Sequence, residues 1–197
     1  MCSSDLLSRT LHRRQGNQRL FWAQQAIAAG VLLAIGALGG WYYAPTEGTE
    51  IASQNSIASQ ALSAHIVYVS EVRHPVEVKV NEKAHLIGWL SKRLGQPLTA
   101  PDLSATGFDL IGGRLLADQN RPAAQFMYEN ADGQRITLYV AANPGGQETA
   151  FRIAGVGATQ SFYWLDGPLG FAITGDIEQS ELMQIARNAY EQLDLQS

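Results

Sequence analysis

The chain has 197 residues, which is room for one domain of ordinary size and an anchoring segment. Its 46% apolar and 9% aromatic residues are typical of a packed core and exclude a disordered chain. The net charge is −4, which is the sum of +3 over residues 1–43 and −7 over residues 44–197. So acidic a segment excludes nucleic acid as a partner of residues 44–197. The one cysteine, Cys2, excludes an internal disulfide and a thiolate-rich zinc site.

The N-terminal part predicts a basic tail over residues 1–20 and a transmembrane helix over residues 21–43. Residues 26–43 contain no charge and no proline. A helix over 21–43 would be about 34 Å long, enough to cross the hydrocarbon core. Aromatic residues stand at both ends, as in the interfacial belts of spanning helices: Phe21, Trp22, Trp41, Tyr42 and Tyr43. Three bulky aromatic residues at the end of the segment also disfavour a signal-peptide cleavage site.

The orientation follows from the flanking charges. Four arginines precede the helix, and the first lysine or arginine after it is Arg73. The positive-inside rule therefore places the N-terminus in the cytoplasm and the rest of the chain outside.

Residues 44–56 are small and polar, and we interpret them as a juxtamembrane linker. The outer domain then spans residues 57–197. A first helix over 57–68 puts Ile57, Ala61, Leu62, His65 and Tyr68 on one face. A second helix is predicted from Asn81, as its N-cap, to Leu94, where Gly95 and Pro97 supply a stop.

A run of strands follows residue 101. Predicted strands cover residues 108–116, 125–128, 136–140, 149–153, 161–165 and 169–174, with Gly112-Gly113 as a bulge. Short turns at residues 130–133, 155–157 and 166–167 make neighbouring strands antiparallel. The segment His74-Pro75-Val76-Glu77-Val78 predicts an extended edge strand or a strand that pairs with a partner; we favour the edge strand.

The last predicted helix begins at Asp176, which would cap it together with Gln179. Its apolar stripe is Leu182, Ile185, Ala186, Ala189 and Leu193. The predicted fold class is therefore α+β: an N-terminal transmembrane helix, then an outer domain with an antiparallel sheet of five or six strands and flanking helices.

The chain offers few residues for chemistry. His65, His74 and His85, with Glu71 and Glu77 nearby, are the candidate metal ligands, but their spacing matches no compact ligand motif. We therefore assign no metal site, and we expect packing or hydrogen-bonding roles for the three histidines. No nucleophile elbow or phosphate loop is present, so we predict no enzyme and no cofactor. A tethered module that binds metal or a small ligand through these histidines is the alternative function.

Several short sequence segments of the predicted outer domain follow one another in an order that is typical of one protein family. These segments are residues 74–78, 85–86, 89–95, 101–103, 107–108, 112–116, 123–128, 149–152 and 162–164. Over about residues 60–193 they resemble the outer domain of bacterial transmembrane anti-sigma factors, which regulate extracytoplasmic-function sigma factors. The resemblance implies signal transduction across the inner membrane, with a periplasmic sensor-like domain. The implied partners are a sigma factor on the cytoplasmic side and a regulatory protease.

The chain departs from that family at its N-terminus. The sigma-binding domain of the family precedes the membrane helix and needs several dozen residues, whereas about twenty stand here, without a His-x-x-x-Cys-x-x-Cys motif. We therefore expect an N-terminal truncation. Residues 1–6, MCSSDL, are also what the end of a common sequencing adaptor encodes, and we interpret them as a possible adaptor artefact.

Overall fold

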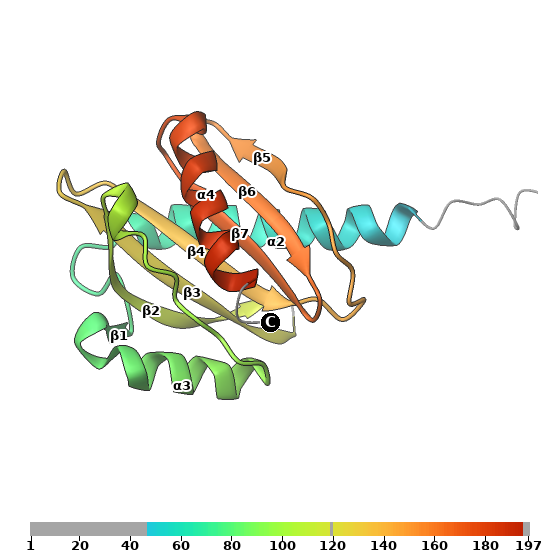
Figure 1. The fold of residues 1–197 in the computed structure, drawn as a ribbon, viewed down its shortest axis with the longest axis horizontal. Coiled ribbons are helices and arrows are strands. Elements are labelled where there is room, and N and C mark those ends of the chain that lie inside the picture. Colours follow the sequence, from blue (N-terminus) through green and yellow to red (C-terminus); the bar gives the residue numbers. More distant parts are fainter. Residues whose placement is uncertain (1–46, 119, 195–197) are drawn as a thin grey trace, which may run out of the picture. The chain divides into compact units, whose positions relative to one another are not determined.

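The computed structural model describes residues 47–118 and 120–194 (Figure 1). The predicted basic tail and transmembrane helix lie outside these ranges. Within them, no helix is both long enough and apolar enough to cross a membrane.

The described part is an α+β domain around one antiparallel sheet (Figure 1). The helices are α2 (Glu47–Val69), α3 (Lys83–Leu94) and α4 (Gln179–Asp194), with 3-10 turns η1 (Val80–Glu82) and η2 (Ser104–Thr106). The strands are β1 (Val78–Lys79), β2 (Phe108–Asp118), β3 (Arg121–Asn130), β4 (Arg135–Ala142), β5 (Arg152–Val156), β6 (Thr159–Asp166) and β7 (Leu169–Gly175). Their spatial order is β1-β2-β3-β4-β7-β6-β5. The prediction of an α+β fold is confirmed, but the sheet has seven strands rather than five or six.

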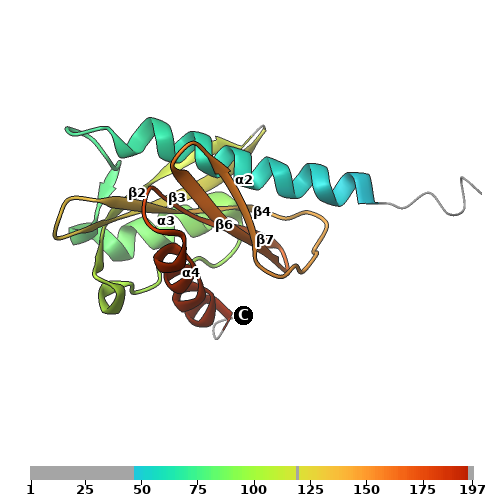
Figure 2. The same cartoon turned by 90° about the horizontal axis from the view of Figure 1, so that it is seen from above.

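Helices cover both faces of the sheet, and Figure 2 shows α2 on one side and α4 on the other. Strand alternation separates the two faces. In β4, Ile136, Leu138 and Val140 join the core beneath α3 and α4, whereas Tyr139 and Ala141 contact the α2 side. The α3/α4 core also holds Leu86, Leu90, Phe126, Trp164, Ile173, Leu182 and Ile185. This larger apolar core provides most of the buried hydrophobic surface of the domain.

The β3–β4 hairpin forms where its turn sequence predicts it. The side-chain oxygen of Asn130 accepts hydrogen bonds from the backbone N–H groups of Asp132, at 3.1 Å, and Gln134, at 2.8 Å. Gly133 takes the left-handed conformation, with φ of 78°. The turn at Gly167 and the short β6–β7 connection are likewise confirmed. The turn predicted over residues 155–157 is displaced, because Gly155 and Val156 belong to β5 and the turn begins at Gly157.

The edge strand predicted over residues 74–78 is confirmed only at its end, where the short β1 forms the edge of the sheet. β1 pairs with β2 through Val78–Gly113 and Lys79–Gly112. At Gly112 the register with β3 shifts, which is the predicted bulge, and φ is 151°. A Cβ at Gly112 would overlap the carbonyl oxygen of Val78. Glycine is therefore required for β1 to approach β2 at this point.

Two predicted helix caps are wrong. Asn81 lies in η1, and α3 starts after Glu82 without a side-chain cap. α4 starts at Gln179, where the N–H of Leu182 donates to the carbonyl of Glu178, so Asp176 precedes the cap position. Asn81 thus stands inside the 3-10 turn that leads directly into α3, and Asp176 stands three residues before the first residue of α4. The predicted stop of α3 at Gly95 and the buried stripe of α4 are confirmed.

Two predicted boundaries also change. α2 begins at Glu47, so residues 47–56 of the predicted linker are helical. No glycine or proline interrupts the sequence between residues 49 and 69, which permits the longer helix. β5 covers Arg152–Val156 rather than residues 149–153, because its register is set by the two-residue turn at Gly157.

Candidate functional site

The surface between α2 and the sheet, which we call the α2 seam, holds the most unusual chemistry of the described residues. Its first half is apolar and combines alanines with larger side chains, among them Tyr163 and Leu165. Ile57, Ala58 and Ala61 of α2 pack against Ala141, Ala172 and other residues of β3, β4, β6 and β7. Gly170 of β7 makes room for Ile57, because a Cβ at Gly170 would overlap the Cδ1 atom of Ile57. The absence of a side chain at Gly170 therefore lets α2 lie close to β7.

The second half of the α2 seam is polar. His65 is 1% exposed, and its Nδ1 atom lies 2.9 Å from Oγ1 of Thr137 on β4. Beside Thr137 in the register, Thr174 of β7 donates to Ser161 of β6 at 2.9 Å. These hydroxyl groups are completely buried. They therefore give the sheet a polar strip beneath the C-terminal half of α2.

A row of buried polar side chains crosses β2, β3 and β4 on the same face. Arg114 stands opposite Gln125, and Gln125 stands opposite Tyr139. Gln125 and Tyr139 are each 1% exposed and Arg114 is 7% exposed. Both amide atoms of Gln125, the hydroxyl of Tyr139 and Nε of Arg114 have no protein partner among the described residues. Because buried polar groups without partners cost free energy, this row lowers the stability of the α2 side of the sheet.

Two arginines hold the C-terminal end of α2 and the loop that follows it. Arg135 of β4 donates to the carbonyl oxygens of Val69, at 2.9 Å, and Glu71, at 2.8 Å, and pairs with Glu129 at 2.6 Å. Carbonyls at a helix C-terminus are the usual partners of a cation. Arg135 therefore fixes the point where α2 leaves the sheet.

Arg114 of β2 holds the next part of the loop. Its guanidinium lies over the ring of Tyr68, with Cζ 3.7 Å from the ring centroid. The same side chain donates to the carbonyl oxygens of His74, at 2.9 Å, and Pro75. Arg114 thus connects the end of α2, the extended segment before β1, and strand β2.

A hollow of about 420 Å³ opens beside His65. Its lining residues come from α2, the β3–β4 turn and the ends of β6 and β7: His65, Ile66, Val69, Gly133, Gln134, Arg135, Thr159 and Asp176. Burial lowers the pKa of His65 to about 4, and the nearby carboxylate of Asp176 opposes this shift. His65 is therefore neutral near pH 7 and lies next to a path for water.

The three candidate histidines do not converge on one site. His65 lies in the α2 seam, whereas His74 is exposed before β1 and His85 is exposed on α3. Within residues 47–118 and 120–194, no group of three or more histidine, cysteine, aspartate or glutamate side chains is placed to hold a metal ion. His65 instead has the hydrogen-bonding role expected for it.

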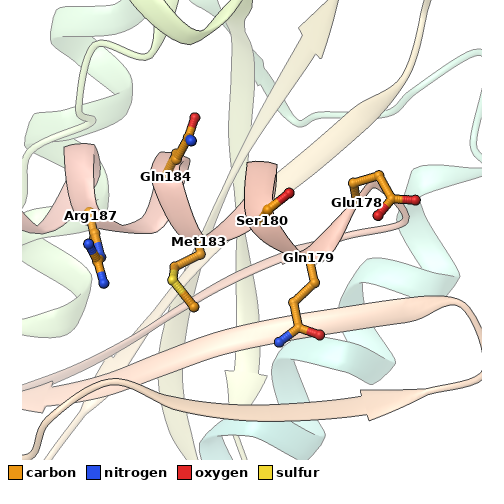
Figure 3. A pocket seen from close by; sticks show the side chains of 6 residues that line it. All are labelled: Glu178, Gln179, Ser180, Met183, Gln184 and Arg187. Carbon is orange, nitrogen blue, oxygen red and sulfur yellow. The ribbon is translucent and has the colours of Figure 1, made fainter.

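Two other hollows lie on the surface. Figure 3 shows the first, of about 540 Å³, whose lining side chains come from α4 and the residue before it: Glu178, Gln179, Ser180, Met183, Gln184 and Arg187. The second, of about 390 Å³, lies between the loop before β5, the end of β6 and Tyr190 of α4. Neither brings together a set of groups with an evident chemical role.

Sequence reasoning found His65 but not the residues that surround it. Thr137, Gln125 and Tyr139 alternate along β3 and β4 in patterns that any two-sided strand would show. Their common position under α2 depends on the packing of that helix, which lies far earlier in the chain, on this face of the sheet. No protein-family model, curated protein or solved structure matches this chain.

Proposed function

We propose that this chain is the anchor and outer domain of a bacterial transmembrane anti-sigma factor. In this proposal the predicted helix over residues 21–43 crosses the inner membrane, with the N-terminus in the cytoplasm and the α+β domain in the periplasm. The domain senses an extracytoplasmic signal, and sigma-factor binding belongs to the cytoplasmic side of the regulator. A regulatory protease is a further proposed partner.

The observation that supports this proposal best is the position of α2. This helix follows the predicted membrane helix after only a few residues, and its C-terminal half lies along the polar half of the α2 seam. A helix that follows the predicted anchor so closely in the sequence, and whose seam with the sheet contains buried polar groups without partners among the described residues, suits signal transmission, since its docking equilibrium can be shifted. The ordered sequence blocks over residues 60–193 provide the second line of support.

The proposal assigns a role to each part of the domain. The apolar α3/α4 core keeps the sheet rigid, because its buried side chains include Trp164, Phe126 and Leu182. The α2 seam is the part that responds. Docked and released α2 would then be two states that report the condition of the outer domain to the membrane helix.

The test uses the chromosomal gene with all of its native coding sequence. We expect a sigma-factor gene beside it, and deletion of the regulator gene should raise transcription from promoters that depend on that sigma factor. Restoring the gene should lower transcription again, because the regulator would once more hold the sigma factor. Unchanged transcription after deletion would contradict the proposal.

A further inference from the structure

His65 is a titratable side chain that α2 places in the interface with the sheet. The ring is 1% exposed and uses Nδ1 for its contact with Thr137, an uncharged partner. The hollow of about 420 Å³ reaches the same ring, so a proton can arrive without unfolding of the domain. A buried imidazole with this access can change its charge where α2 meets the sheet.

The charged groups around His65 would stabilise a protonated imidazole ring only weakly. From α2, Ile66 and Val69 line the hollow, and Thr159 lines it from β6. Arg135 of β4 is itself a cation and is already paired with Glu129. Asp176, after β7, is the carboxylate among the lining residues, and it is exposed to solvent. Protonated His65 would therefore be a partly desolvated charge that an exposed carboxylate balances only in part.

We infer that the α2 seam is an acid-sensitive latch: protonation of His65 releases the C-terminal half of α2 from the sheet. This inference rests on the proposed function for its physiological meaning, since release of α2 would be the signal passed to the membrane helix. Acidity of the outer compartment would then be one stimulus of the regulator.

The direction of the pH effect follows from the two environments of the ring. Burial lowers the pKa of docked His65 to about 4, whereas an exposed ring in released α2 returns to the ordinary value of 6.5. The released state therefore binds more protons between these values. Docking weakens by up to about tenfold per pH unit as the pH falls through this window, and changes no further once both states are protonated.

The latch is tested by hydrogen exchange on the full chain in lipid nanodiscs between pH 7.5 and 4. Exchange of α2 amides is expressed relative to α4 amides, because intrinsic exchange rates change equally for both helices. We expect this ratio to rise steeply below about pH 6.5 in the unaltered chain. A ratio that stays constant over the whole range would overturn the inference.

Matched variants identify the responsible imidazole. His65→Gln should abolish the pH dependence, and His85→Gln, which removes an exposed imidazole from α3, should leave it intact. If His65→Gln releases α2 at every pH, Asp176→Asn decides the question. Loss of this carboxylate should leave the onset near pH 6.5 unchanged and give a higher exchange ratio at pH 4 than in the unaltered chain, because Asp176 favours the charged ring in the docked state. A ratio at pH 4 no higher than in the unaltered chain, or a persistent transition in His65→Gln, would contradict the latch.

The latch and the proposed function can fail separately. The exchange experiment measures only the chain itself and needs no sigma factor. If α2 releases with acid but deletion of the gene leaves sigma-dependent transcription unchanged, the latch stands and the proposed function falls. If transcription rises after deletion but α2 stays docked at all pH values, the opposite conclusion holds.

Discussion

The guanidinium of Arg114 lies over the ring of Tyr68, 3.7 Å from Cζ to the ring centroid, so β2 holds the last turn of α2. The same arginine donates to the backbone of the segment that leads into β1. One side chain therefore connects the helix that follows the predicted membrane anchor to the first two strands of the sheet. This connection makes Arg114 the most informative residue for a test of the α2 seam.

Replacing Arg114 with lysine should weaken the docking of α2 although the positive charge remains. An ammonium group cannot stack on Tyr68 in the same way as a planar guanidinium while it donates to two carbonyls. We expect a loss of about 2 kcal/mol in the free energy of unfolding, measured by denaturant titration. Arg93→Lys is the control, because Arg93 is exposed on α3 and should tolerate the change. Equal stability of the two variants would show that the Arg114 contacts contribute nothing.

Gly170→Ala should push α2 away from β7 in the apolar half of the α2 seam. The added Cβ would overlap Cδ1 of Ile57 and approach Cδ2 of Leu165 to 2.8 Å. We expect a loss of about 1–3 kcal/mol in the free energy of unfolding. The double variant Gly170→Ala with Ile57→Val should recover part of this loss, because valine lacks the Cδ1 atom.

Gly88 provides the matched glycine control for that experiment. It lies in α3, and no heavy atom lies within 4 Å of the position that an added methyl group would take. Gly88→Ala should therefore raise stability by about 0.5–1 kcal/mol through a better helix propensity. If both glycine variants are stabilised alike, the close approach of Ile57 to β7 is not present in solution.

Amides of α2 should exchange faster than amides of α4 and β4 at pH 7.5. The α2 seam combines a small apolar cluster with buried polar groups that lack a protein partner among the described residues, whereas α4 buries Leu182 and Ile185 completely in the larger core. Local opening is cheapest where the fewest apolar contacts are lost. Mass-spectrometric hydrogen exchange measures this order, and equal protection of α2 and α4 would argue against a separate response of α2.

Leu182→Ala should lower the stability of the whole domain rather than release α2 alone. Leu182 is 0% exposed and lies in the α3/α4 core, where truncation leaves a cavity. A loss of about 2–5 kcal/mol in the free energy of unfolding is expected, with faster exchange in every element. Faster exchange of α4 amides alone would contradict this prediction, because it would show that α4 opens without unfolding of the sheet.

Local signals explain which parts of this fold are predictable from the sequence. Asn130 and Gly133 define a hairpin turn within four residues, and Gly95 ends a helix by its own conformation, so the predictions at both places are confirmed. The predicted caps at Asn81 and Asp176 are wrong, because Asn81 lies inside the 3-10 turn η1 and α4 begins three residues after Asp176.

The α2 seam is beyond sequence reasoning for a different reason. Arg114, Gln125 and Tyr139 lie on three consecutive strands, and their alignment depends on the register of those strands, which the bulge at Gly112 shifts. Periodicity places His65 on the buried face of its helix, but it cannot identify Thr137 as its partner, 72 residues away. Contacts of this kind depend on the topology of the sheet, which no local pattern encodes.

The account depends most directly on which side of the membrane the sheet occupies. Alkaline phosphatase, which is active only outside the cytoplasm, can be fused after Leu20 in one strain and after Ser197 in another. The account predicts phosphatase activity for the Ser197 fusion and none for the Leu20 fusion. An inactive Ser197 fusion that is nevertheless produced in full would contradict the account, because α2 would then have no outer signal to transmit.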